Sequence, residues 1–253
     1  MPQRNLIRWN ATTSGRWRLA TGVLLASIWF LPGQNARAED TDLRMWMPVQ
    51  FIHSNGEKWT FSFQTETRLK ERIAEFEKQV YKPAVNIHFN ETWWLSLGYK
   101  WIDRNSQILG DEHEPWQELH YNKTIDDLSS GFQLRLEERF IQNIDGVLPR
   151  LRLLQHLSHP IGDSPNYITG FCAIRFNLDE KGEGPVSGFE QSRIFVGLGR
   201  HIGERVQLEG GYLWQYERER TVENRSNHVI RFFLVFNTQA KRIQKPRQRD
   251  FFR

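Results

Sequence analysis

Hydrophobic and polar residues alternate along most of the chain after residue 39. In residues 58–68, apolar side chains such as Trp59, Phe61 and Phe63 alternate with polar ones. Successive side chains of a strand point to opposite faces, so a period of two predicts strands with one apolar and one polar face. Helical periodicity is almost absent. The alternation predicts ten strands, at about 58–68, 82–89, 93–101, 118–122, 131–140, 149–157, 166–176, 192–200, 205–216 and 228–237.

One further segment, residues 42–53, alternates in the same way and is joined to the next strand by a turn at Asn55-Gly56. An even number of strands starts and ends a barrel on the same side of a membrane. The pattern therefore favours ten strands, with residues 42–53 surplus in the periplasmic mouth. Twelve strands are the alternative if one partner is unrecognised.

Two architectures fit such amphipathic strands. In a soluble barrel or sandwich the apolar face is internal, whereas in an outer-membrane barrel it meets lipid and the charged face lines the lumen. The segments run to about ten residues, the length a tilted strand needs to cross a bilayer, while strands of soluble proteins average about five or six. The connections also alternate in length, as in bacterial outer-membrane barrels. The longer ones are 69–79, 104–115, 177–191 and 217–227, and the shorter ones are 90–92, 125–130, 158–165 and 201–204, with 141–148 intermediate.

Aromatic residues collect near the ends of the predicted strands, where girdles at the headgroup level are expected. The residues assigned to this aromatic girdle are Trp59, Phe89, Trp93, Trp101, Trp116, Tyr212 and Trp214. Together these features predict an all-β protein, a single antiparallel transmembrane β-barrel of about ten strands.

The N-terminus has the pattern of an export signal. The apolar run Leu19–Leu31 has 13 residues and is followed by Ala36-Arg37-Ala38, with small residues where a signal peptidase needs them. A helix of that length spans only about 20 Å, against about 30 Å of hydrocarbon in a bilayer. We therefore expect residues 1–38 to be a cleaved signal peptide and residues 39–239 to be the barrel, located in the outer membrane of a Gram-negative bacterium.

The basic charge of the chain lies at its ends. The formal net charge is +4, but residues 39–239 carry 23 basic and 29 acidic side chains, and a separate basic tail occupies residues 240–253. A nucleic-acid-binding protein carries its basic charge on the folded domain, so no nucleic-acid partner is expected. The single cysteine, Cys172, excludes an internal disulfide framework and a multi-cysteine zinc site.

Several short phrases follow one another along the chain, namely Gly98-Tyr99, Trp116-Gln117, Arg135 to Phe140, Arg150-Leu151-Arg152, Gly197-Leu198-Gly199 and Gly211-Tyr212-Leu213. In this order they resemble a bacterial family of outer-membrane barrels catalogued as domain of unknown function 2490. The resemblance covers most of residues 40–236. It implies barrel architecture, the outer membrane with its lipid as surroundings, and barrel-assembly machinery as a partner, and it carries over no catalytic residue. One departure is that such barrels end at a terminal aromatic, here Phe236, whereas this chain continues for 17 residues to Arg253.

The charged faces of the strands supply the candidate chemistry. In a narrow barrel these side chains either form a selective pore or ligand site, or neutralise one another as a hydrogen-bonded structural ladder, and the second interpretation is favoured. The charges expected to line the lumen are Glu66, Arg68, Lys100, Glu118, Arg135, Glu137, Arg139, Arg152, Glu209 and Arg231.

Catalytic and metal-binding signals are weak. His156 and Ser158 have the spacing of a hydrolase pair, but they fall at a short turn on the presumed periplasmic side. Residues 111–114 place acids beside a histidine, in what reads as a solvated acidic loop. We expect no catalytic residue, no metal and no cofactor. The leading interpretation is a monomeric narrow channel, or a structural and surface-interaction barrel. The alternatives are a lipid- or peptide-hydrolysing barrel, and a soluble periplasmic barrel that binds an apolar ligand.

Overall fold

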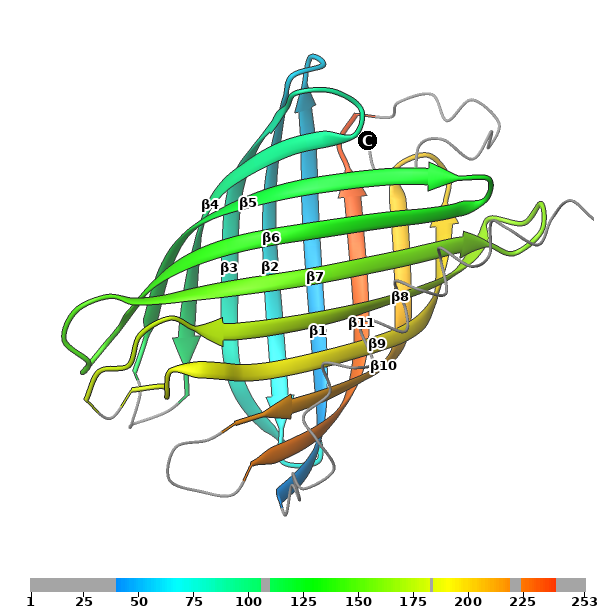
Figure 1. Cartoon of the computed structure of the whole chain (residues 1–253). Coiled ribbons are helices and arrows are strands. Elements are labelled where there is room, and N and C mark those ends of the chain that lie inside the picture. Colours follow the sequence, from blue (N-terminus) through cyan, green and yellow to red (C-terminus); the bar gives the residue numbers. More distant parts are fainter. Residues whose placement is uncertain (1–39, 106–109, 183, 219–223, 240–253) are drawn as a thin grey trace, which may run out of the picture. The chain divides into compact units, whose positions relative to one another are not determined.

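A computed structural model describes residues 40–105, 110–182, 184–218 and 224–239. These residues form eleven strands that close into one barrel (Figure 1). The predicted signal peptide and basic tail lie outside the described residues. No helix in this part of the chain is long and apolar enough to cross a membrane. The strands are β1 (Asp40–Asn55), β2 (Trp59–Lys70), β3 (Glu75–His88), β4 (Trp93–Arg104), β5 (Glu112–Ile125), β6 (Leu128–Ile141), β7 (Leu148–Pro160), β8 (Asn166–Asn177), β9 (Gly188–Ile202), β10 (Val206–Glu217) and β11 (Arg225–Asn237).

The barrel closes between its first and last strands. Every strand pairs antiparallel with the next in sequence, and β1 pairs parallel with β11, from Asp40 beside Arg225 to Ile52 beside Asn237. The segment expected to be surplus is therefore part of the wall, and the strand count is eleven rather than ten or twelve. With an odd number of strands, β1 and β11 run in the same direction. The first strand therefore begins at one end of the barrel and the last strand finishes at the opposite end.

The two mouths differ in the length of their connections. The turn mouth is formed by residues 56–58, 89–92, 126–127, 161–165 and 203–205. The loop mouth is formed, among the described residues, by 71–74, 105, 110–111, 142–147, 178–182, 184–187, 218 and 224. The predicted alternation holds except for the long connection expected at 69–79. That connection is the short turn 71–74, since β2 and β3 extend farther than their apolar alternation. The carboxylate of Asp42 accepts hydrogen bonds from the backbone N–H groups of Glu71 and Arg72, both at 3.1 Å.

The apolar faces of the strands point outward. Phe61, Phe63, Leu97 and Leu198 are between 42% and 60% exposed. The inner face carries the buried charges and one apolar cluster, formed by Trp46, Phe195, Leu213 and Val229. The chain is therefore arranged with its polar groups inside.

Inward-facing glycines make room for large rings on the inner wall. A Cβ atom at Gly98 would overlap the indole of Trp116, and one at Gly199 would overlap the ring of Tyr167. A Cβ atom at Gly197 would lie 2.6 Å from the ring of Phe195. The Gly-containing phrases that carry the family resemblance thus mark places where an aromatic ring lies close to the backbone of the wall.

Candidate functional site

The lumen holds one cavity of about 1180 Å³ that is lined from both mouths. Its lining includes Glu204 and Asn237 at the turn mouth, and Gly184 and Arg218 at the loop mouth. All ten charged side chains expected in the lumen lie on its wall. Sequence reasoning missed other charged residues of this wall. Apart from Lys82, which begins the predicted strand 82–89, they lie beyond the predicted strand ends or on less regular strands. These are Arg44, Lys70, Glu77, Lys78, Lys82, Arg104, Glu112, Glu114, Arg150, Arg175, Glu190, Arg193, Glu204, Arg205, Glu217, Arg218 and Arg225.

A buried ion-pair network fills the part of the wall near the loop mouth. The side chains of Glu114 and Glu137 are fully buried, and both bind Arg150, with N–O distances of 3.0 Å and 2.5 Å. Arg150 also contacts Glu190 at 3.0 Å, and Arg139 contacts Glu190 at 3.2 Å. This part of the lumen matches the structural ladder that the alternating charges predict. The acidic segment 111–114 is not a solvated loop, because Glu112 and Glu114 belong to β5 and point inward.

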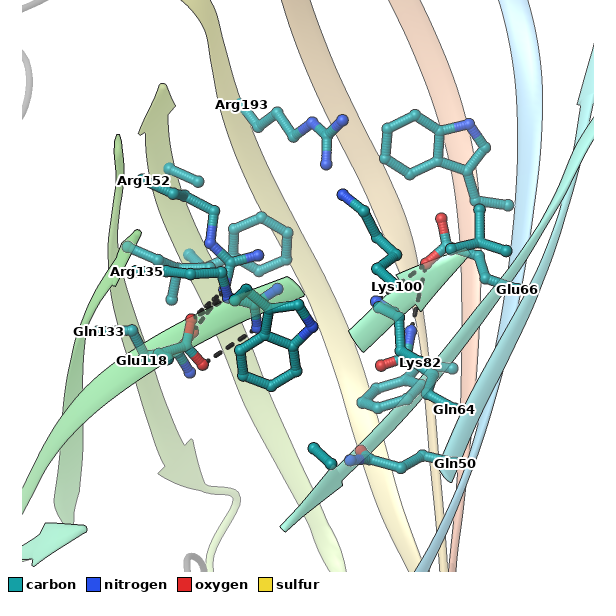
Figure 2. A pocket seen from close by; sticks show the side chains of 18 of the residues that line it. Gln50, Gln64, Glu66, Lys82, Lys100, Glu118, Gln133, Arg135, Arg152 and Arg193 are labelled. Atoms are coloured by element: carbon teal, nitrogen blue, oxygen red, sulfur yellow. Dashed lines mark hydrogen bonds and ion pairs between the residues drawn. The ribbon is translucent and has the colours of Figure 1, made fainter. Parts of the chain in front are cut away.

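A second group lies midway along β5, β6 and β7. The carboxylate of Glu118 accepts hydrogen bonds from Arg135 Nε at 2.7 Å and from Arg152 Nη2 at 2.6 Å (Figure 2). Arg152 also donates to Gln133 Oε1 at 3.1 Å. The guanidinium of Arg135 stacks on the indole of Trp116, 3.9 Å from its ring centroid.

The assignment of Trp116 to the outer aromatic girdle is wrong, because its side chain lies inside the barrel. It is 7% exposed and lines the lumen. The alternation explains this position, since Trp116 is two residues before the inward-facing Glu118 and therefore shares its face. The other aromatic residues assigned to the girdle lie on the outer surface. Of these, Trp59, Phe89, Trp93, Trp101 and Tyr212 are exposed, and Trp214 is half-buried.

A third group lies on the wall formed by β1, β2 and β3. Glu66 binds Arg68 at 2.5 Å, and Lys82 Nζ lies 3.9 Å from Glu66. The indole of Trp46 is flanked by two guanidinium groups, Arg68 at 3.9 Å and Arg193 at 4.6 Å from its ring centroid. Figure 2 shows Glu66 and Lys82 on one side of the cavity and Glu118 with Arg135 and Arg152 on the other.

The lumen charges do not cancel. Among the described residues the cavity is lined by seventeen Arg and Lys side chains and ten Glu side chains. Within the described part of the chain, Arg175 and Arg193 have no carboxylate oxygen within 4 Å, although both face the cavity. A neutral structural ladder therefore describes the network near the loop mouth, and not the whole lumen.

The arrangement of histidines does not match a hydrolase. His156 Nε2 forms a hydrogen bond with Thr169 Oγ1 at 2.9 Å. Ser96 Oγ and a Glu118 oxygen both lie 2.9 Å from His120 Nε2. A catalytic relay needs the hydroxyl on one ring nitrogen and the acid on the other, and here both share Nε2. No group of three or more His, Cys, Asp or Glu side chains able to hold a metal occurs among the described residues.

Comparisons with known proteins agree with the barrel architecture. A family model described as "Protein of unknown function (DUF2490)" matches residues 43–227. An uncharacterized protein of Methylorubrum extorquens is 24% identical over 217 residues, which cover 83% of this chain and 95% of that protein.

Two solved structures are among those that match this chain. The NanC porin matches with a TM-score of 0.51 and 12% identity, over 77% of this chain and 98% of that chain. LpxR from Salmonella typhimurium matches with a TM-score of 0.43 and 9% identity, over 70% and 83% of the two chains.

Proposed function

This chain belongs to the DUF2490 family of proteins of unknown function, and from that premise we propose that it is an outer-membrane β-barrel whose lumen forms a narrow channel. The observation that carries the proposal is the cavity, which is lined by residues of both mouths and by charged side chains throughout. The fold of a porin, at 12% identity, is compatible with this function.

The outer surface supports a membrane location. The strands have 12 to 16 residues, more than the roughly 9–11 that a tilted strand needs to span a bilayer. Aromatic side chains lie near both rims of the apolar surface. Trp93 and Tyr121 pack together near the turn mouth, with ring centroids 4.7 Å apart. Near the loop mouth, His113 stacks on Trp101 and its Nδ1 forms a hydrogen bond with Tyr99 Oη at 2.6 Å. Such rings are favoured at the membrane–water interface.

The apolar outer face of the strands argues against a soluble barrel that binds an apolar ligand. That alternative needs the apolar strand faces inside, whereas Phe63 and Leu134 are 42% and 37% exposed on the outside. A soluble protein would leave this whole surface in water, at a cost of roughly 25 cal/mol for each Å². Lipid removes that cost.

Fractionation followed by gel electrophoresis tests the membrane location. The protein is expected in the outer-membrane fraction, and its mobility should change on boiling, because a folded barrel stays compact in detergent until heated. A soluble periplasmic protein with no mobility change would contradict the proposal.

Planar-bilayer recordings test the channel. We expect the purified, folded protein to conduct, and Ala84→Trp, on the lumen wall of β3, to lower the single-channel conductance. Val85→Trp is the matched control, because the next residue of the same strand points outward. A folded outer-membrane protein that does not conduct would overturn the proposed channel.

A further inference from the structure

The charges of this barrel are sorted between its lumen and the rest of its surface. Residues 39–239 carry more acidic than basic side chains, 29 against 23. The described residues that line the cavity show the opposite balance, with seventeen basic and ten acidic side chains and no aspartate. The acidic excess of the domain therefore lies outside the lumen, and the lumen is electropositive.

Four arginines occupy four consecutive strands on one side of the lumen. Arg135, Arg152 and Arg175 lie directly opposite one another in the registers of β6, β7 and β8. Arg193 follows on β9, where its register partner on β8 is Ala173, two residues before Arg175. We call these four residues the arginine row. Figure 2 shows Arg152 and Arg193 extending into the cavity.

The arginine row has too few carboxylates to balance it. Glu118 binds both Arg135 and Arg152, while Arg175 and Arg193 have no carboxylate within 4 Å in the described part of the chain. Arg135 has one further contact, with Glu137 at 3.5 Å, and Glu137 also binds Arg150. Like charges directly opposite on neighbouring strands are destabilising, so the arginine row is a site of electrostatic repulsion in the barrel wall.

A bound oxyanion would relieve this repulsion. The planar guanidinium group presents paired N–H donors that match carboxylate and phosphate oxygens. The Nε atoms of Arg152, Arg175 and Arg193 are buried and have no hydrogen-bond partner in the described structure. Lys82 adds a further cation to the opposite wall, 3.9 Å from Glu66.

We propose that the lumen is selective for anions, and that the arginine row is a binding site for small solutes bearing carboxylate or phosphate groups. This inference rests on the proposed channel for its transport aspect. The binding site itself requires only the folded barrel.

Reversal potentials in planar bilayers under a KCl gradient test the selectivity. The wild-type permeability ratio of chloride to potassium is expected to exceed one. Arg175→Gln and Arg193→Gln should each lower the ratio, and Glu118→Gln, which frees Arg135 and Arg152, should raise it. Arg200→Gln is the matched control, since it removes the same charge from an exposed position on the outer face of β9 and should leave the ratio unchanged. Each variant is first checked for the mobility change on boiling.

Direct titration of the folded protein in detergent tests the site without transport. Inorganic phosphate and citrate are the two probes, and they distinguish a preference for phosphate from one for carboxylates. Binding of at least one probe should weaken severalfold in Arg175→Gln and stay unchanged in Arg200→Gln.

The outcomes separate the two proposals. A protein that conducts but does not prefer anions, or whose ratio is indifferent to Arg175 and Arg193, overturns the selectivity and retains the channel. A protein that binds phosphate or citrate but never conducts retains the site and overturns the channel. Absence of binding by both probes in the folded wild type overturns the site.

Discussion

At the scale of single residues, the inner wall depends on the pairing of glycines with aromatic rings. The ring of Tyr167 lies over Gly199, and its hydroxyl donates a hydrogen bond to Glu209 at 3.0 Å. Tyr167 is only 2% exposed, so its ring is enclosed by the inner wall. A shift of the ring would break the hydrogen bond to Glu209. Gly199 has an ordinary strand conformation, so what it provides is space rather than backbone freedom.

Gly199→Ala is expected to destabilise the barrel by about 1–3 kcal/mol, the usual range for overpacking an interior. The added methyl group would overlap the ring of Tyr167, which must then move. Denaturant unfolding of the protein in lipid vesicles measures the change. Gly210→Ala is the control, because Gly210 points outward and its nearest neighbour is the flexible ring of Phe232 at 3.3 Å. In a Tyr167→Ala background the cost of Gly199→Ala should disappear. An equal cost in both backgrounds would contradict the pairing.

At the scale of elements, the alternation of side chains predicted the two faces better than the ends of the strands. It placed Phe63 outside and Glu66 inside, because a period of two is a property of each strand by itself. It could not locate the strand ends near the loop mouth. There Lys78 and Glu112 have the polarity of a loop, and only the assembled lumen shows that they face other charges. Some ion pairs of the lumen join strands that are not consecutive in the chain, so the local pattern could not predict them.

The depth of a strand residue in the membrane sets the cost of placing a charge on its outer face. Leu134 lies midway along β6 and points outward, and Phe140 lies near the loop-mouth end of the same strand. We expect Leu134→Arg to destabilise the barrel by about 2–4 kcal/mol and Phe140→Arg by about 0–1 kcal/mol. Unfolding in lipid vesicles again provides the measurement. Equal costs at the two positions would mean that the apolar surface is not a membrane-spanning band.

At the scale of the whole molecule, the parallel closure separates the two ends of the barrel chain. Parallel pairing of β1 with β11 places Thr41 at the loop mouth, with Asp179 of the connection 178–187. Asp163 belongs to the connection 161–165 at the turn mouth. A ten-stranded barrel with residues 42–53 outside the wall would instead start at Trp59, at the turn mouth, and leave Thr41 on that side. The odd count is a further feature of the fold that strand periodicity could not predict, since closure depends on how the first and last strands meet.

Cysteine labelling of intact cells distinguishes the two topologies. In a Cys172→Ala background, Asp179→Cys and Thr41→Cys are expected to react together with a membrane-impermeant maleimide, because the longer loops of outer-membrane barrels face outward. Asp163→Cys should react only after the outer membrane is permeabilised. All three side chains are exposed, so differences in labelling report on the side of the membrane rather than on burial. Labelling of Thr41→Cys together with Asp163→Cys would show that residues 42–53 do not cross the wall, and that the parallel seam between β1 and β11 is wrong.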